Sequence, residues 1–157
     1  MLHLGYHKSP SRQSGFTIIE AMISLVILTF GLLGVGSMVM KGLTMNHSSY
    51  LRSLAMQQAY DFADRARGNT VGVTAGNYDT VTYTANQTCT PCTSAAVCTA
   101  AQMATYDKCY WNTQNETLLP LGRGTVTRSG AEFVITVSWD DNKSGAAGKS
   151  FVLRAQP

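Results

Sequence analysis

The dominant pattern in the chain is an apolar run from Phe16 to Met40, in which Glu20 is the one ionisable residue. At about 1.5 Å per residue, a helix over this run is long enough to cross about 30 Å of hydrocarbon. A charged side chain at the bilayer centre costs about 2.5–3.5 kcal/mol, and such residues usually have a partner and a function. The pattern therefore predicts a membrane-spanning helix with Glu20 about one turn from its start. Glu20 is either a carboxylate that snorkels to the interface or a functional group.

Helical periodicity continues beyond the apolar run and predicts one helix over residues 16–67, about 78 Å long. Gly68 and Asn69 form a plausible stop signal. Charged residues near the end of this helix are interpreted either as a solvated face or as a contact with the distal domain or with another subunit. Glycines within the helix allow close approach of a neighbouring helix or mark a bend. The apolar stripe consists of Leu51, Leu54, Ala55, Gln58, Phe62 and Ala66, the charged residues are Asp61, Asp64, Arg65 and Arg67, and the glycines are Gly31, Gly34, Gly36 and Gly42.

The remainder of the chain reads as a small domain with one helix and several strands. A helix is expected over Thr99–Trp111, with Thr99 as its N-cap and with Met103 and Trp111 in the core. Strands are expected over 81–84, 124–128, 132–139 and 150–155, the last antiparallel to its predecessor. Alternation in the third of these places its apolar side chains on one face. The polar loop 140–148 carries Asp140 and Asp141, which we interpret as a solvated turn rather than a cation site.

Four cysteines lie in the distal half of the chain, namely Cys89, Cys92, Cys98 and Cys109. A redox CxxC site would need a thioredoxin-like βαβ context, and a zinc site would need a second paired spacing or a nearby histidine. Neither is present in the sequence, so two structural disulfides are expected in an oxidising compartment. A bond between Cys98 and Cys109 would span about three helical turns, which exceeds the bridging limit of about 7 Å. Two connectivities remain: Cys89–Cys98 with Cys92–Cys109, or Cys89–Cys109 with Cys92–Cys98.

Composition argues against several function classes. The formal net charge is only +3, and no basic cluster is present, so direct nucleic-acid binding is not expected. The three histidines, His3, His7 and His47, all precede the distal domain. No catalytic constellation or phosphate-binding glycine loop is found, and we expect no enzyme activity, no cofactor and no metal site.

The stretch Gly15-Phe16-Thr17-Ile18-Ile19-Glu20 follows a short leader that contains Lys8 and Arg12 and no acid. This junction resembles the class III signal of type IV pilins and type II secretion pseudopilins. The resemblance implies that prepilin peptidase cuts after Gly15, that the amine of Phe16 is then N-methylated, and that Glu20 is the assembly carboxylate. A freed Phe16 amine could be neutralised by Glu20 of a neighbouring copy, and losing one partner would leave a buried charge unpaired. Basic residues in the leader keep that end cytoplasmic.

Further segments resemble minor pilins of the PilV kind, known as type IV pilus modification proteins. They are Asn46–Ala55 and Ala59–Arg67 in the long helix, Cys98–Asp107 with Trp111, Leu119–Gly124, and the final strands. The resemblance implies the type IV pilin fold, an α+β class with a long N-terminal helical spine and a small head of one short helix and an antiparallel sheet. It also favours the pairing Cys89–Cys98, with Cys92–Cys109 as an additional bond.

The expected organisation is a leader over 1–15, a membrane and assembly half of the spine over 16–40, an amphipathic half over 41–67, and a periplasmic head over 68–157. The resemblance implies a minor pilin that primes pilus assembly and so supports twitching, adhesion or DNA uptake. Its implied partners are prepilin peptidase, other minor pilins, the major pilin, the inner-membrane assembly machinery and a tip adhesin. It would reside in the bacterial inner membrane and then in the pilus. The alternatives are a type II secretion pseudopilin and a membrane-anchored periplasmic redox protein or enzyme.

Overall fold

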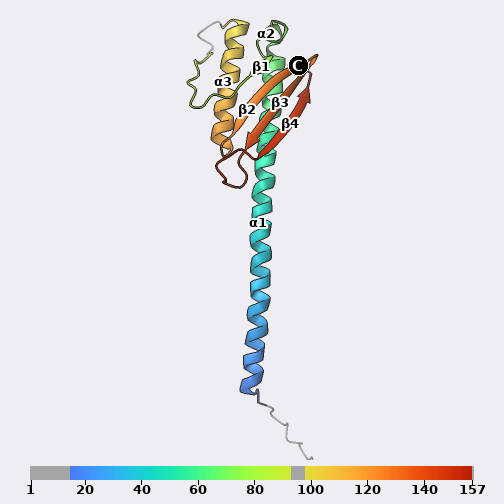
Figure 1. Ribbon diagram of the computed structural model, residues 1–157, viewed down its shortest axis with the longest axis vertical. Helices are drawn as coiled ribbons and strands as arrows, with labels where there is room; N and C mark the ends of the chain where they lie inside the picture. Colours follow the sequence, from blue (N-terminus) through green and yellow to red (C-terminus); the bar gives the residue numbers. More distant parts are fainter. Residues whose placement is uncertain (1–14, 93–97, 157) are drawn as a thin grey trace, which may run out of the picture. The chain divides into compact units, whose positions relative to one another are not determined.

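The structure of the protein is a computed structural model that describes residues 15–92 and 98–156 (Figure 1). Most of the expected leader, residues 1–14, lies outside the described residues. The chain divides into two compact units, one ending at Leu43 and the other beginning at Thr44. Each unit is described by itself below.

Helix α1 spans Ile18–Gly68, which confirms the long helix expected from the hydrophobic periodicity. The carbonyl oxygen of Thr17 accepts from the backbone N–H groups of Glu20 and Ala21 at 3.1 and 3.2 Å, and these bonds open the first turn. Helix α1 ends at the predicted stop, where the N–H of Asn69 donates to the carbonyl of Ala66 at 3.0 Å. Up to Leu43 the helix has the length and composition of a membrane span, with a mean hydropathy of 2.3 in its most apolar window.

The C-terminal unit contains one antiparallel sheet of four strands in the order β1-β2-β3-β4 (Figure 1). The strands are β1 Thr80–Val81, β2 Arg123–Ser129, β3 Glu132–Trp139 and β4 Lys149–Ala155. Strand β3 has the predicted bounds, and its register with β4 pairs Ile135 with Leu153. The strand expected over 81–84 is much shorter, because the pairing with β2 includes only Thr80 and Val81. Tyr83, which follows β1, is not paired with β2, and its hydroxyl donates to the carboxylate of Glu116 at 3.0 Å.

Two helices complete this unit. Helix α3 spans Ala100–Leu118, and Thr99 forms the predicted N-cap as part of a capping box with Gln102. The five-residue helix α2, Thr70–Thr74, was not predicted; it is capped by Asn69, whose side chain accepts from the N–H of Gly72 at 3.0 Å.

The core lies between the second half of α1, α3 and the inner face of the sheet. The side chain of Trp111 is fully buried, its ring centroid lies 4.6 Å from that of Phe62, and its Nε1 donates to the carbonyl of Gln58 at 2.7 Å. The inner face of β3 is buried as the alternation predicted, with Phe133, Ile135, Val137 and Trp139 all in the core. Met103 was expected in the core and is 40% exposed, because it lies on the outer side of α3.

Candidate functional site

The N-terminal residues singled out from the sequence all lie on exposed backbone or exposed helix. Phe16 is 82% exposed, and Gly15 precedes it in the described chain. Glu20 lies in the first turn of α1, where a negative charge complements the helix dipole. Within the described residues no cation lies in ion-pair range of this carboxylate, so a group of opposite charge must come from elsewhere if Glu20 is to be paired in lipid.

The surface around Glu20 is apolar, and no other described residue of the chain covers it. Large hydrophobic side chains such as Ile23, Leu28 and Phe30 are more than half exposed over the whole first unit. The hydroxyls of Thr29 and Ser37 donate to the carbonyls of Val26 and Gly34, at 2.8 and 2.9 Å. These hydroxyls are thereby satisfied within the helix, as a side chain in an apolar medium requires.

The glycines of this unit have open space around them. A Cβ built on Gly31, Gly34, Gly36 or Gly42 would meet no atom within 4 Å. In a single copy of the chain these positions therefore need no glycine for packing. Small residues on an apolar helix allow another helix to approach closely, so the positions suit contact with a neighbouring helix.

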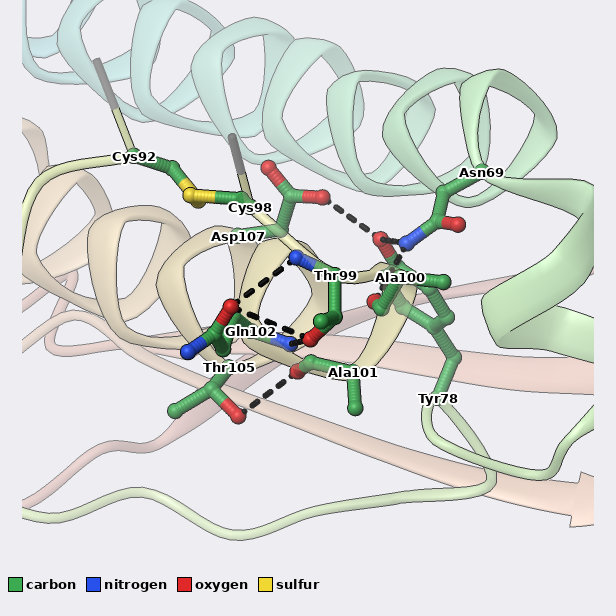
Figure 2. The surroundings of a disulfide bond; sticks show 10 residues. All are labelled: Asn69, Tyr78, Cys92, Cys98, Thr99, Ala100, Ala101, Gln102, Thr105 and Asp107. Atoms are coloured by element: carbon green, nitrogen blue, oxygen red, sulfur yellow. Dashed lines mark hydrogen bonds between the residues drawn. A yellow bond between two sulfur atoms is a disulfide. The ribbon is translucent and has the colours of Figure 1, made fainter. Parts of the chain in front are cut away.

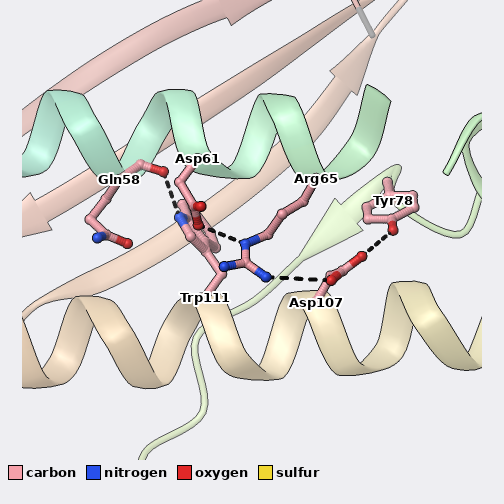
Figure 3. A network of polar contacts seen from close by, with 6 residues as sticks. All are labelled: Gln58, Asp61, Arg65, Tyr78, Asp107 and Trp111. Atoms are coloured by element: carbon pink, nitrogen blue, oxygen red, sulfur yellow. Dashed lines mark hydrogen bonds and ion pairs between the residues drawn. The ribbon is translucent and has the colours of Figure 1, made fainter. Parts of the chain in front are cut away.

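A polar network joins the second half of α1 to α3 (Figure 3). The guanidinium of Arg65 contacts Asp61 at 2.7 Å, one turn earlier on α1, and Asp107 of α3 at 3.6 Å. Asp107 also accepts a hydrogen bond of 2.5 Å from the hydroxyl of Tyr78. Arg65 stacks over the ring of Tyr110, with its Cζ 4.9 Å from the centroid. The charged residues at the end of α1 thus contact the rest of the C-terminal unit directly, and Arg67, which pairs with Asp64 at 3.0 Å, also donates to the carbonyl of Gln156 at 3.2 Å.

Burial and hydrogen bonding set the acid–base behaviour of this network. Burial of Tyr78 and its bond to Asp107 raise the pKa of its phenol well above the usual value. For Arg65, burial acts to lower the pKa, but the hydrogen bond and charge of Asp61 outweigh it and the pKa is raised. Both groups therefore keep the protonation state in which they act as donors at neutral pH.

The four cysteines form two disulfides, Cys89–Cys109 and Cys92–Cys98. The pairing expected from the resemblance, Cys89–Cys98 with Cys92–Cys109, is wrong; the connectivity is the other one that geometry allowed. Cys109 lies on α3 and faces the irregular segment that contains Cys89, with 5.6 Å between their Cα atoms. Cys98 directly precedes the N-cap Thr99 and bonds to Cys92 (Figure 2). Cys89 and Cys92 are thus in different bonds, which does not favour a CxxC redox pair.

The turn after β3 is exposed over residues 142–146, as expected for a solvated turn, but its first residue is buried. Asp140 is only 4% exposed, and its carboxylate accepts from the N–H groups of Asn142 and Gly145 and from the hydroxyl of Ser144. Burial acts to raise the pKa of Asp140, but these hydrogen bonds outweigh it and hold the pKa below its usual value. Asp141 accepts from Ser48 of α1 at 2.8 Å. Among residues 15–92 and 98–156 no group of three or more His, Cys, Asp or Glu side chains could hold a metal ion.

Two features of the C-terminal unit were not established from the sequence. The role of Asp140 as a buried acceptor of loop N–H groups was not recognised, although Asp followed by Asn and Gly is a usual signal for such a turn. The contact from Arg65 to Asp107 was left as one alternative, since the sequence did not indicate which residue of the domain would face the end of α1.

Two family models match consecutive parts of the chain. The model of the prokaryotic N-terminal methylation motif matches residues 10–36, and the model described as type IV pilin Tt1218 matches residues 38–109. No curated protein and no solved structure matches the chain. The first model covers the junction with Gly15, Phe16 and Glu20, and the second covers α1 from Met38 onward, α2, β1 and α3 as far as Cys109.

Proposed function

Because the chain is a type IV pilin that carries the N-terminal methylation motif, we propose that it is a minor pilin whose residues Gly15, Phe16 and Glu20 govern its processing and assembly. Type IV pilins are structural proteins rather than enzymes, and the long helix with a small antiparallel sheet is their α+β fold. The motif implies processing by prepilin peptidase and assembly with other pilins.

Cleavage between Gly15 and Phe16 frees an amine two positions before the first residue of α1, Ile18. The peptidase then methylates this amine, which remains a cation. We propose that the cation meets Glu20 of an adjacent pilin, and that the amine of another subunit meets Glu20 of this chain. The observation that carries the proposal is the exposed Glu20, which has no ion-pair partner among residues 15–92 and 98–156 and lies within an otherwise apolar surface. Pairing it removes the cost of an isolated charge in an apolar medium.

The rest of the first unit supports lateral packing. Its exposed apolar side chains suit lipid before assembly and neighbouring helices afterwards, and its glycines allow those helices to approach. We propose that residues 1–15 are the cytoplasmic leader, 16–40 the membrane and assembly half of the spine, 41–67 its amphipathic half, and 68–157 the periplasmic head.

The proposed role as a minor pilin rests on the segments that resemble PilV-type minor pilins, among them Asn46–Arg67 and Cys98–Trp111. On that basis the protein would move from the inner membrane into the pilus and help to prime its assembly. Its partners would be other minor pilins, the major pilin, the assembly machinery and a tip adhesin. Support of twitching, adhesion or DNA uptake would follow from pilus formation.

The first test is the intact mass and N-terminal sequence of the protein from membranes with and without prepilin peptidase. We expect a chain that begins at methylated Phe16 only when the peptidase is present. A chain cut elsewhere, or one that keeps its leader in both strains, would overturn the assignment of Gly15 and Phe16.

The role of Glu20 is tested separately by comparing Glu20→Gln with the matched control Asp64→Asn. Both changes neutralise one exposed carboxylate on α1, and Asp64 contacts only Arg67. We expect Glu20→Gln to be processed normally and to be lost from sheared pili, while Asp64→Asn assembles like the parent. Normal incorporation of Glu20→Gln would exclude an assembly role for this carboxylate. Fractionation in strains that lack either the pilus or the type II secretion genes would identify a pseudopilin instead.

A further inference from the structure

Strand β4 forms one edge of the sheet and pairs on one side only, with β3. Among the described residues, no backbone hydrogen bond connects the strand Lys149–Ala155 to any segment other than β3. Its other side therefore presents a row of N–H and C=O groups without protein partners. Such an edge is a template for an additional strand, and native proteins usually shorten, bulge or cover it. This one is seven residues long.

The side chains next to this edge are incompletely covered. Phe151, Leu153 and Ala155 point to the inner face, yet each is only partly buried, whereas their partners on β3 are fully buried. Leu54 of α1 is also partly buried and packs against the same core. Phe151, Leu153 and Ala155 form a partly buried apolar strip along the edge strand, which we call the β4 strip. A further strand would cover it with every second side chain.

The charge of the edge narrows the choice of partner. Between residues 142 and 156 the chain carries Lys143, Lys149 and Arg154 and no acidic residue. Arg154 projects from the outer face of the sheet, is 64% exposed, and has only a 3.8 Å contact with Glu132. Antiparallel pairing of β4 with the same strand of a second copy, centred on Val152, would place Arg154 opposite Ser150 and Lys149 opposite Ala155, so it would offer no carboxylate to either cation. A partner strand with carboxylates on its outer face would be attracted instead.

We propose that the open edge of β4 binds an extended segment of a different protein as a fifth strand, and that this segment alternates apolar with acidic residues. Its backbone would pair with the free edge, its apolar side chains would cover the β4 strip, and its carboxylates would lie beside Arg154. Main-chain pairing supplies affinity in this mode, and the alternate side chains supply specificity. The surface belongs to the C-terminal unit and does not depend on cleavage at Gly15 or on Glu20, so it is tested independently of them.

The test uses the full chain in dodecylmaltoside micelles and a fluorescein-labelled peptide of alternating valine and glutamate, about ten residues long. Binding is followed by fluorescence anisotropy, and a valine–lysine peptide serves as the charge control. The variant is Arg154→Glu, and its matched control is Arg123→Glu, which reverses an exposed cation on β2 rather than on the open edge. We expect saturable binding of the glutamate peptide that Arg154→Glu weakens about five- to ten-fold and Arg123→Glu leaves unchanged.

Hydrogen exchange then locates the bound peptide. We expect amides within Lys149–Ala155 to gain protection when the glutamate peptide is added, and amides of β1, at the opposite edge, to remain as they were. The proposal is overturned if the glutamate peptide does not bind, if the lysine peptide binds equally well, or if both arginine variants weaken binding alike. Protection confined to another strand, or a dimer of the free chain joined through β4, would overturn it as well.

Discussion

Arg65 of α1 lies 3.6 Å from Asp107 of α3, and the Asp107 carboxylate is the point at which three segments meet. Tyr78, from the chain before β1, donates to the same carboxylate, and Asn69 donates to the Tyr78 hydroxyl at 3.1 Å. The side chain of Asp107 is 9% exposed and that of Arg65 is 26% exposed, so water screens the pair only in part. The contact orients α3 against the second half of α1.

Removing the Asp107 carboxylate should destabilise the C-terminal unit. Asp107→Ala leaves both Tyr78 and Arg65 without this acceptor, and we expect a loss of about 2–4 kcal/mol in the free energy of unfolding. Asp107→Asn keeps an oxygen for Tyr78 but removes the charge, and should cost about half as much. Urea unfolding of the full chain in micelles, followed by near-ultraviolet circular dichroism, measures both.

A matched surface change provides the control for this effect. Asp64→Asn removes the carboxylate of an exposed pair, in which the Asp64 side chain is 71% exposed, and should change the free energy of unfolding by less than about 0.5 kcal/mol. An equal loss in Asp64→Asn and Asp107→Asn would contradict a special role of the Arg65–Asp107 contact.

Stability should fall at alkaline pH because of Tyr78. Its pKa is raised in the folded chain by burial and by the bond to Asp107, so the native state holds this proton more tightly than the unfolded state does. The resulting stabilisation is present in full below the unfolded tyrosine pKa of about 10 and is lost as pH rises above it. Melting temperatures between pH 8 and pH 11 should decline more steeply in the parent than in Tyr78→Phe. Parallel curves for the two proteins would contradict the prediction.

The two disulfides should contribute unequally to stability. Cys89–Cys109 closes a loop with a sequence separation of 20, and Cys92–Cys98 closes one of 6. In the chain-entropy account these loops correspond to about 3 and about 2 kcal/mol. We expect the double serine variant of the first pair to melt at a lower temperature than that of the second.

Peptide mapping without reductant provides the control on connectivity. A linked peptide containing Cys89 and Cys98 would contradict the pairing described above, whatever the melting temperatures.

A methyl group at Gly124 should be poorly tolerated. A Cβ at this position would overlap the six-membered ring of Trp111 and lie 2.6 Å from Nδ2 of Asn115. Gly124→Ala should therefore cost at least about 1–3 kcal/mol of stability by overpacking. Gly148→Ala is the control, since a Cβ there meets nothing nearer than an oxygen at 4.0 Å. Equal melting temperatures of the two variants would contradict this prediction, because they would show that Trp111 and Asn115 can move to accommodate the added methyl group.

Local patterns predicted those elements whose own residues carry a clear signal. Alternation over Glu132–Trp139 gave the bounds and the buried face of β3, and the N-cap residue Thr99 gave the start of α3. Helix α2 was missed because five residues are too few to display a helical period. Its sequence, Thr70–Thr74, consists of threonine, valine and glycine, which are not strong helix formers. Met103 was misplaced because helical spacing identifies a face but does not say which face meets the core.

Contacts between distant residues were less accessible from the sequence. Helix geometry excluded Cys98–Cys109, but the choice between the two remaining pairings depended on the path of the irregular segment before α3. The local pattern after β3 is that of an Asp-initiated turn, but the burial of Asp140 depended on how this turn packs against the rest of the unit. Packing within a single chain cannot reveal the roles of Gly15, Phe16 and Glu20, because the proposed roles involve a peptidase and neighbouring pilins.

The disulfide between Cys89 and Cys109 has a mechanical consequence for the C-terminal unit. The chain from Thr82 to Cys92 forms neither helix nor strand, and such a segment would normally be the first to extend when the molecule is pulled. Here it is bonded covalently to the middle of α3 through Cys109 and to the start of α3 through Cys98. Force that reaches Cys89 or Cys92 is therefore passed directly to a helix that α1 already holds, and the stretch between these two cysteines cannot lengthen while both bonds are intact and α3 stays folded.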